Sequence, residues 1–370
     1  MFGLFFIHFP LKQNSVATTV NLYTECQIFA INNEQIIQLN LINLDYQKIW
    51  PFELLKNSSR LINSIDDFRF DGEESLMKID QFRNELQSEP ANIMNSCLVF
   101  LFLYLSIGDL SERKSIKIEI KSNLPNGAGL GSSSAYIVSL AEALFTAFKV
   151  SIDKKEFNRW CWEMDKLFHG KPSGVDNSIC TYGGAILFRN GQLIEQIDHE
   201  NLPELKVILV NTQVPRNTKN LVEKCRQRLT IFNDIGNQLL ELLNSVSQQV
   251  WFTLKQDQSN LNQLSTLFEM NQHLLNCLNV GHEKIDEIVA IAKRHDLSAK
   301  LTGAGGGGVV MIYLNSMFLK KKSICFSLKV KFSFHFTDDT KQESLLKQLH
   351  SNGFVTYQVK LGVSGVHTVN

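Results

Sequence analysis

The 370-residue sequence lacks an excess of charge of either sign, since 37 Lys and Arg residues balance 37 Asp and Glu residues. Proteins that bind nucleic acid or an anionic membrane through a broad electrostatic field carry a surplus of positive charge. This balance predicts that the chain binds neither nucleic acid nor a membrane surface.

The sequence also lacks closely paired cysteines and an apolar segment of membrane length. Its seven cysteines are dispersed without a Cys-x-x-Cys pair, which is typical of reduced, buried thiols in an intracellular protein. The longest apolar run, residues 97–107, is too short to cross a bilayer and predicts a buried helix. Residues 1–12 are apolar but have neither a charged start nor a clear cleavage site, which argues against a signal peptide. We expect a soluble, cytoplasmic protein of mixed helices and strands.

Two common phosphate-binding signatures are absent as well. The chain contains no G-x-x-x-x-G-K-[ST] loop, and no His-Arg-Asp or Asp-Phe-Gly tripeptide. Any phosphate chemistry is therefore not that of a P-loop nucleotidase or of a protein kinase.

A glycine- and serine-rich loop is the most informative feature that is present. Residues 124–135 (LPNGAGLGSSSA) follow an alternating, strand-like segment at 115–121 and precede a helical pattern at 135–148. Glycines let the backbone approach a ligand closely, and the N–H groups that begin a helix favour an anion such as phosphate. Serine hydroxyls at the same point can bond phosphate or ligate Mg²⁺. The alternative is a plain turn that caps a helix.

Two further loops suit phosphoryl transfer. Residues 169–177 (HGKPSGVDN) place an aspartate after a Pro-Ser-Gly turn, and residues 301–308 (LTGAGGGG) precede a buried strand at 309–314. A triphosphate requires backbone donors and a metal, and a hydroxyl acceptor requires a base near its proton. The competing interpretation of Asp176 is an ordinary turn or helix-cap residue.

Hydrophobic periodicity predicts the organisation of the rest of the chain. Residues 21–40 hold two strand-like runs around an Asn-Asn turn, which predicts a hairpin. We expect two domains, residues 1–200 and 201–370. Helices are predicted at 67–107, 154–168, 219–295 (with breaks near 257–259 and Gly281) and 338–352, and a strand at 205–210.

Two segments, residues 1–13 and 315–336, differ from the rest in composition. They contain no Asp or Glu and are rich in Phe, Lys, Ser and Leu. One interpretation is a basic loop for a partner, and another is a pair of strands peculiar to this protein. On composition we favour a third, that residues 315–336 are an insertion and that both segments are translated non-coding sequence.

The order of the motifs resembles the GHMP small-molecule kinases. PNGAGLGSSSA is similar to their second motif and KLTGAGGGGVV to their third, while HGKPSGVDNSICTYGGAILF and VNTQVPRNTKNLV resemble the branch that acts on mevalonate. The similarity runs from about residue 14 to 314 and resumes at about residue 337. It implies an α+β, two-domain GHMP kinase fold, with a ribosomal-protein-S5-like α/β domain at 1–200 that binds ATP and a ferredoxin-like α+β domain at 201–370. It also implies ATP- and Mg²⁺-dependent phosphorylation of the primary hydroxyl of mevalonate, in isoprenoid and sterol precursor synthesis.

The resemblance implies a site for ATP and Mg²⁺. Ser133 and Asp165 are the implied metal ligands, although the family has a glutamate at the second position and Asp is one methylene shorter. The competing interpretation of Asp165 is a solvated helix carboxylate. The residues implied in wrapping the ATP phosphates are Asn126, Gly127, Ala128, Gly129, Leu130, Gly131, Ser132, Ser133 and Ser134.

The resemblance further implies a catalytic base and an acceptor pocket. Asp176 is the implied base, which takes the proton of the mevalonate hydroxyl as the γ-phosphoryl group arrives. Arg216 is our candidate for binding the mevalonate carboxylate with its planar guanidinium group. The alternatives are a structural hydrogen bond at His169 and a proline-initiated helix start at 215–218. The residues implied in binding the acceptor are His169, Arg216, Thr218, Gly303, Ala304 and Gly305.

The first motif of the family, a Pro-Gly-Lys strand followed by a Gly-Glu-His turn, is missing upstream of residues 15–23. Residues 1–13 read MFGLFFIHFPLKQ, and Lys12 lies too close to the next strand to replace the motif's lysine. We therefore expect the strand that carries this motif to be absent or replaced.

Two functions remain open. The first is a mevalonate-phosphorylating enzyme whose first motif is incompletely represented in this sequence. The second is an impaired homologue that binds ligand without efficient turnover. Among enzymes, a GHMP kinase for another alcohol, such as a sugar or phosphomevalonate, is the runner-up. Dimers are common in the family, so a homodimer is one expectation.

Overall fold

A computed structural model of the chain describes residues 2–6, 14–31, 36–51, 80, 82–107, 115–125, 129–215, 218–256, 260–314 and 339–369. The strands are β1 (Phe2–Phe6), β2 (Asn14–Val20), β3 (Thr24–Ala30), β4 (Ile36–Leu41), β5 (Tyr46–Pro51), β6 (Ile116–Ser122), β7 (Ala185–Arg189), β8 (Gln192–Ile197), β9 (Leu205–Asn211), β10 (Ser298–Leu301), β11 (Val309–Leu314) and β12 (Val355–Leu361). The helices are α3 (Ala91–Ser106), α4 (Ser132–Ala147), α5 (Lys154–His169), α6 (Val175–Tyr182), α7 (Thr218–Ile231), α8 (Asn233–Lys255), α9 (Gln263–Cys277), α10 (Glu283–Arg294) and α12 (Asp339–Ser351).

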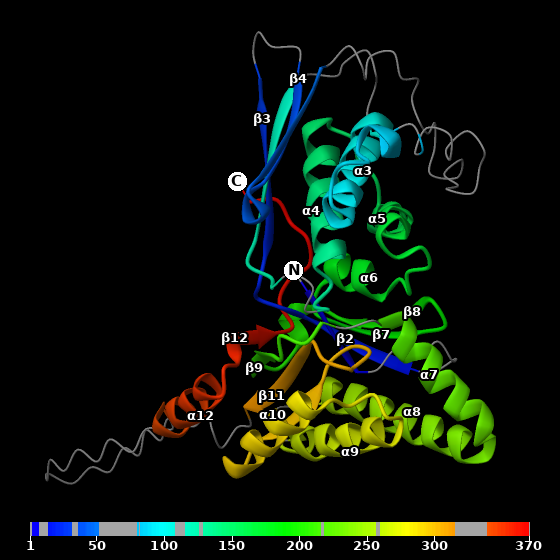
Figure 1. Cartoon of the computed structure of the whole chain (residues 1–370), viewed down its shortest axis with the longest axis vertical. Coiled ribbons are helices and arrows are strands. Elements are labelled where there is room, and N and C mark those ends of the chain that lie inside the picture. The colour runs from blue at the N-terminus through cyan, green and yellow to red at the C-terminus, as the bar shows by residue number, and fades with distance from the viewer. Residues whose placement is uncertain are drawn as a thin grey trace, which may run out of the picture.

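A four-stranded sheet has the order β3-β6-β4-β5, with α3 and α4 on one side (Figure 1). The hairpin predicted for residues 21–40 is wrong, because β6 lies between β3 and β4 and pairs with both. A strand has two edges, and those of β4 are taken by β5 and by β6. On the side that faces the helices, alternate residues such as Ile37, Leu39 and Ile118 are fully buried.

An eight-stranded sheet has the order β10-β11-β9-β12-β2-β7-β8, and β1 pairs with β2 outside this path. β2, β7 and β8 come from the first half of the chain and β9 to β12 from the second. The two sets meet where Leu361 of β12 pairs with Val20 of β2. The large sheet therefore crosses residue 200, and the division into domains at 1–200 and 201–370 stays a prediction.

The two faces of β2 carry different helices. Ala17 packs with Val175 and Ile179 of α6, whereas Val16, which points to the opposite face, belongs to the core that includes Val250 of α8. In Figure 1, α6 lies above the large sheet and α8, α9 and α10 lie below it. The helix that bears Asp176 is thus fixed directly on the sheet.

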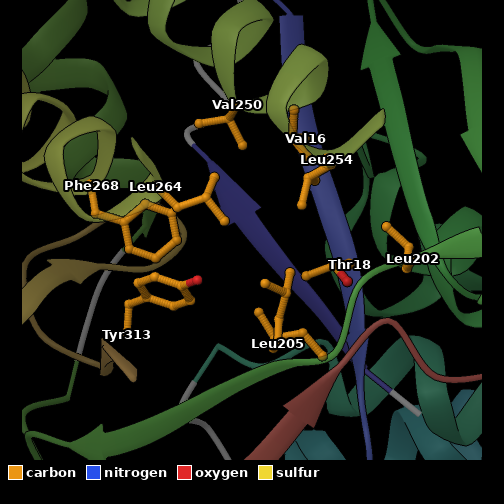
Figure 2. A pocket seen from close by; sticks show the side chains of 10 residues that line it. Val16, Thr18, Leu202, Leu205, Val250, Leu254, Leu264, Phe268 and Tyr313 are labelled. Carbon is orange, nitrogen blue, oxygen red and sulfur yellow. The ribbon is translucent and has the colours of Figure 1, made fainter. Parts of the chain in front are cut away.

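A small pocket lies between the large sheet and helices α8 and α9. Figure 2 shows its lining, which includes Val16, Val250, Leu264 and Phe268 and is almost entirely apolar. Its volume of about 20 Å³ accommodates roughly one water-sized sphere. A nucleotide is far larger, so this pocket is a packing defect and not the site of phosphate chemistry.

The first strand, β1, contains part of the segment whose composition is unusual. Its backbone pairs antiparallel with β2, from Phe2 opposite Val20 to Phe6 opposite Val16, and it also lies against α6. The expectation that the strand carrying the first motif is absent or replaced stays a prediction. Residues 315–336 lie outside the part of the chain that the structure describes, so the interpretation of that segment stays a prediction.

The helix predicted at 67–107 is only partly correct, because residues 86–90 form a turn and α3 begins at Ala91, while residues 67–79 lie outside the described part of the chain. Most of the other predicted elements correspond to observed ones. The helical patterns at 135–148, 154–168 and 338–352 become α4, α5 and α12, and the long pattern at 219–295 becomes α7 to α10. The run at 97–107 forms the buried second half of α3. None of the described helices is both long enough and apolar enough to span a bilayer.

Candidate active site

The start of α4 is suited to an anion. Gly131 precedes the helix at φ +61°, a left-handed conformation that costs a residue with a Cβ about 1–2 kcal/mol. It has no side chain to cap the first N–H groups of α4, and these carry the positive end of the helix dipole. The first turn holds Ser132, Ser133 and Ser134 and no acidic residue. Three of the predicted phosphate-binding residues lie outside the described residues: Asn126, Gly127 and Ala128.

A buried carboxylate, Asp165 of α5, lies beside these serines. The hydroxyl of Ser134 donates to Asp165 Oδ2 at 3.2 Å, and Ser133 Oγ lies 2.9 Å from His169 Nε2. His169 is one helical turn beyond Asp165, and its Nε2 lies 3.7 Å from Asp165 Oδ1. The structure thus brings Ser133, Asp165 and His169 together.

The environment of Asp165 argues against the solvated-carboxylate interpretation. Its exposed fraction is only 2%. Burial raises the pKa of the carboxyl group, while His169 and the hydrogen bond from Ser134 act in the opposite direction. Oδ1 accepts no hydrogen bond from any residue that the structure describes. A buried carboxylate oxygen without a donor is costly unless a further ligand meets it.

Asp176 lies in the first turn of α6 and its position is fixed by the loop that precedes it. The hydroxyl of Ser178 donates to Gly174 O at 2.6 Å, and the indole N–H of Trp162 donates to Pro172 O at 3.3 Å. Asn177 ties the same turn to α5. The backbone that carries Asp176 is therefore anchored to the helix that carries Asp165.

The two carboxylates lie on helices that pack against each other and against α4: Asp165 on α5 and Asp176 on α6. Burial raises the pKa of the Cys180 thiol to about 12, and the negative charges of Asp176 and Asp165 both add to this shift. Both carboxylates therefore act on one buried sulfur atom of α6. The serines at the start of α4, Asp165 and Asp176 form a single polar region at the junction of α4, α5 and α6.

The third glycine loop is held by buried hydrogen bonds at its end and in its middle. The O atom of Gly308 accepts from the N–H and from the hydroxyl of Thr212, both at 2.8 Å. The N–H of Gly306 donates to Val280 O at 2.8 Å. At Gly305, where φ is +81°, a Cβ atom would lie 2.1 Å from the same Val280 oxygen. No side chain larger than hydrogen fits there without displacing the loop.

The segment with the sequence VPRNT lies against this loop. A Cβ atom at Gly307 would lie only 2.8 Å from Val214 O. α7 is described from Thr218 onward, and residues 216–217 lie outside the described part of the chain, so the proline-initiated helix start stays a prediction. Arg216 and the side chain of Thr218 lie outside the residues described. The structure therefore places Gly307 against the VPRNT segment and Gly305 against Val280, and it leaves the guanidinium position untested.

Sequence reasoning missed the buried polar residues that support the third loop. Thr212 was read only as part of a motif, and Gln272 and Lys300 were given no role. Gln272 accepts a hydrogen bond from the N–H of Leu301 at 2.7 Å, and Lys300 is fully buried. A lysine inside an otherwise apolar strand segment is the one signal in the sequence that points to such a role.

Comparisons with known proteins define the class to which this fold and site belong. A sequence model of the GHMP kinases N terminal domain matches residues 93–184, which include α4, α5 and Asp176. A model of the GHMP kinases C terminal domain matches residues 250–316, which include the third glycine loop. The chain has the GHMP kinase fold and is similar to small-molecule kinases of that class.

Relatives identify the family more narrowly. Mouse mevalonate kinase is 32% identical over an alignment of 377 positions, which covers 96% of this chain and 89% of the mouse protein. The chain belongs to the mevalonate kinase family. Among solved structures, Methanococcus jannaschii mevalonate kinase superposes with a TM-score of 0.71 at 20% identity, covering 97% of this chain and 96% of that one. L. major mevalonate kinase in complex with R-mevalonate gives a TM-score of 0.69 at 18% identity, covering 99% and 95%.

Proposed function

We propose that this chain transfers the γ-phosphoryl group of ATP to the primary hydroxyl of mevalonate. The observation that carries the proposal is the polar region where α4, α5 and α6 pack together, which combines a helix N-terminus, serine hydroxyls and a carboxylate on each of α5 and α6. Backbone donors and oxygen ligands are what a triphosphate requires, and a separate carboxylate is what a hydroxyl acceptor requires. The identity with mouse mevalonate kinase supports mevalonate as that acceptor.

The start of α4 is the proposed cradle for the ATP phosphates. Its N–H groups and dipole favour the negative charge, and Ser132, Ser133 and Ser134 add hydroxyl donors. Gly129 and Gly131 allow the backbone to approach the phosphates without a Cβ in the way. Residues 126–130 complete the cradle in this proposal.

Asp165 and Ser133 are the residues that fit Mg²⁺. Asp165 supplies a buried carboxylate oxygen, Oδ1, that accepts no hydrogen bond from the described residues. Ser133 supplies a hydroxyl and is the neighbour of Ser134, which donates a hydrogen bond to the other oxygen of Asp165. Mg²⁺ in kinase sites takes one or two protein oxygens and completes its shell with phosphate oxygens and water. When bound, the ion neutralises charge on the transferring phosphoryl group.

Asp176 is the proposed catalytic base. As the mevalonate oxygen forms its bond to the γ-phosphorus atom, the bond to ADP breaks and the hydroxyl proton passes to the Asp176 carboxylate. The anchored backbone of α6 holds this carboxylate in place without rearrangement. We assign His169, Thr218 and the Gly303, Ala304 and Gly305 backbone to the acceptor pocket, and Arg216 to the mevalonate carboxylate.

An impaired homologue that binds the same ligands is the second candidate function, and β1 is the observation that favours it. β1 pairs with β2 and contacts α6, and its sequence, FGLFF, contains no cation. In a complete first motif, a lysine would lower the pKa of the base or stabilise the transferring charge. Without it, binding can persist while turnover is slow.

A direct assay tests the proposed function. Purified chain is expected to release ADP from ATP only when Mg²⁺ and mevalonate are both present, while phosphomevalonate and galactose give no turnover. A second version, with residues 1–13 replaced by a Pro-Gly-Lys strand and a Gly-Glu-His turn, is expected to turn over faster. If neither version turns over but ATP still binds, the impaired homologue is favoured. Equal rates would show that the missing lysine is unimportant.

A substitution at Asp165 tests the metal assignment. Asp165→Asn is expected to raise the Mg²⁺ concentration that gives half-maximal activity at least about tenfold, because it removes the charged ligand. Glu163→Gln is the matched control, since Glu163 is a buried carboxylate on the same helix that pairs instead with Lys166 at 2.7 Å. The assignment is wrong if both variants respond to Mg²⁺ as the parent does.

We propose that the reaction takes place in the cytoplasm. All six cysteines within the described residues are free thiols, as is usual in a reducing compartment. Cys277 is exposed, in contrast to the buried thiols expected from the sequence. Mevalonate, ATP and Mg²⁺ are the proposed ligands, and a homodimer stays a prediction.

A further inference from the structure

The strand that leads into the third glycine loop, β10, is an edge strand. It pairs only with β11 in the large sheet, with Lys300 opposite Met311 and Leu301 opposite Val310. The N–H of Thr302 donates to Val309 O at 3.0 Å, and residues of an antiparallel pair alternate between bonded and non-bonded positions. The N–H and C=O groups of Leu301 therefore point away from β11, toward the free edge.

Two side chains satisfy these edge groups. Gln272 of α9 accepts from the N–H of Leu301 at 2.7 Å, and the ammonium group of Lys300 donates to the C=O of Leu301 at 2.6 Å. The Gln272 amide is itself oriented, because its Nε2 donates to Asn276 Oδ1 at 2.9 Å. Both backbone polar groups of Leu301, its N–H and its C=O, are thus held by side chains, and we call Lys300 and Gln272 the Leu301 clamp.

Stability alone does not account for a lysine at this position. Lys300 has an exposed fraction of 0%, and burial lowers the pKa of its amine to about 7. A methionine has similar length and carries no desolvation cost, so replacing a buried charge by an apolar side chain often stabilises a protein. A hydrogen bond from an ammonium group is shorter and stronger than one between neutral groups. The lysine is explained if the orientation of the Leu301 carbonyl matters.

The clamp acts where the loop begins, and other contacts hold its middle and end. Thr302, the residue after Leu301, donates to Val309 O through both its N–H and its hydroxyl. Val280, which follows α9, accepts from the N–H of Gly306. α9 and the turn after it therefore fix both the entry and the middle of the loop, while Thr212 fixes its end.

We propose that Lys300, together with Gln272, is a positioning residue for phosphoryl transfer, because the Leu301 clamp sets the path of the Thr302–Gly308 loop. Lys300 touches neither ATP nor the acceptor in this scheme and acts through the backbone that it orients. The inference rests on the proposed function for its kinetic consequence, but the effect on the loop itself is measurable without any turnover.

The test compares Lys300→Met with the parent chain and with Met311→Leu, a volume-conserving change at its cross-strand partner. In Lys300→Met, hydrogen–deuterium exchange of the 302–308 amides is expected to accelerate at least about tenfold, because the charge-assisted hydrogen bond from Lys300 to the Leu301 carbonyl is lost. The value of kcat is expected to fall about ten- to a hundredfold, with KM values changed little, because the loop is misplaced and not removed. Met311→Leu is expected to alter neither quantity.

The possible results separate this inference from the proposed function. Parent-like exchange in Lys300→Met overturns the clamp, and faster exchange with unchanged kcat overturns its role in the reaction. A parent chain without turnover overturns the proposed function, whereas the exchange comparison still decides whether the clamp holds the loop. Should Lys300→Met fail to fold, Gln272→Leu removes the other half of the clamp, and parent-like loop exchange in that variant contradicts the inference.

Discussion

Replacing Asp176 by asparagine is expected to lower kcat by about 10²- to 10⁴-fold while ATP still binds. Asparagine keeps the size and the local hydrogen-bonding shape of the side chain, but it cannot take the proton of the acceptor hydroxyl. The turn that carries residue 176 is anchored through Ser178, Trp162 and Asn177, so the fold is expected to survive the change. The loss should therefore appear in the chemical step, measured by rapid-quench single turnover with radiolabelled ATP.

A second carboxylate in a first helical turn provides the control for this experiment. Asp234 lies in the first turn of α8 and is exposed, remote from the serines of α4. Asp234→Asn removes the same favourable interaction with a helix dipole as Asp176→Asn does. The control should therefore leave kcat unchanged. If Asp176→Asn retains kcat within about threefold of the parent, general-base catalysis by this residue is wrong, since such catalysis contributes far more.

The helices of the site were predictable because their signals are local. The repeat of apolar residues in 135–148 and 154–168 indicates helices, and these are α4 and α5. Spacing on α5 also predicts that Asp165 and His169 share a face, because residues four apart in a helix are neighbours. The proximity of Ser133, by contrast, was expected only from resemblance to a family, since no local pattern relates residues 133 and 165.

Strand pairing was less predictable because a strand can pair with a segment that is distant in the sequence. Residues 21–40 read as a hairpin, yet β6, about ninety residues away, pairs with both of its strands. The pairing of β1 with β2 is likewise not revealed by the composition of β1. The role of Lys300 was hidden for a similar reason, since its meaning depends on β10 being an edge strand covered by α9.

The third glycine loop offers the second large effect, at Gly305. Gly305→Ala is expected to lower kcat/KM by about 10²-fold, because displacement of a substrate-contacting loop by an ångström has consequences of that size. The new Cβ atom would lie 2.1 Å from Val280 O, the same oxygen that accepts the N–H of Gly306. Relief of the clash requires the loop and Val280 to separate, and this breaks the bond that holds the middle of the loop.

Backbone strain and steric clash at Gly305 can be separated with a matched glycine. Gly353 has nearly the same φ, +80° against +81°, but a Cβ atom there would meet nothing within 4 Å. Gly353→Ala therefore carries only the strain of a left-handed alanine, about 1–2 kcal/mol in the free energy of unfolding, and should keep full activity. Gly305→Ala carries that strain and a further overpacking cost of about 1–3 kcal/mol. Urea unfolding and steady-state kinetics on both variants measure the difference. Equal stability and equal activity would show that the loop yields freely at this position, and hence that its path does not govern the reaction.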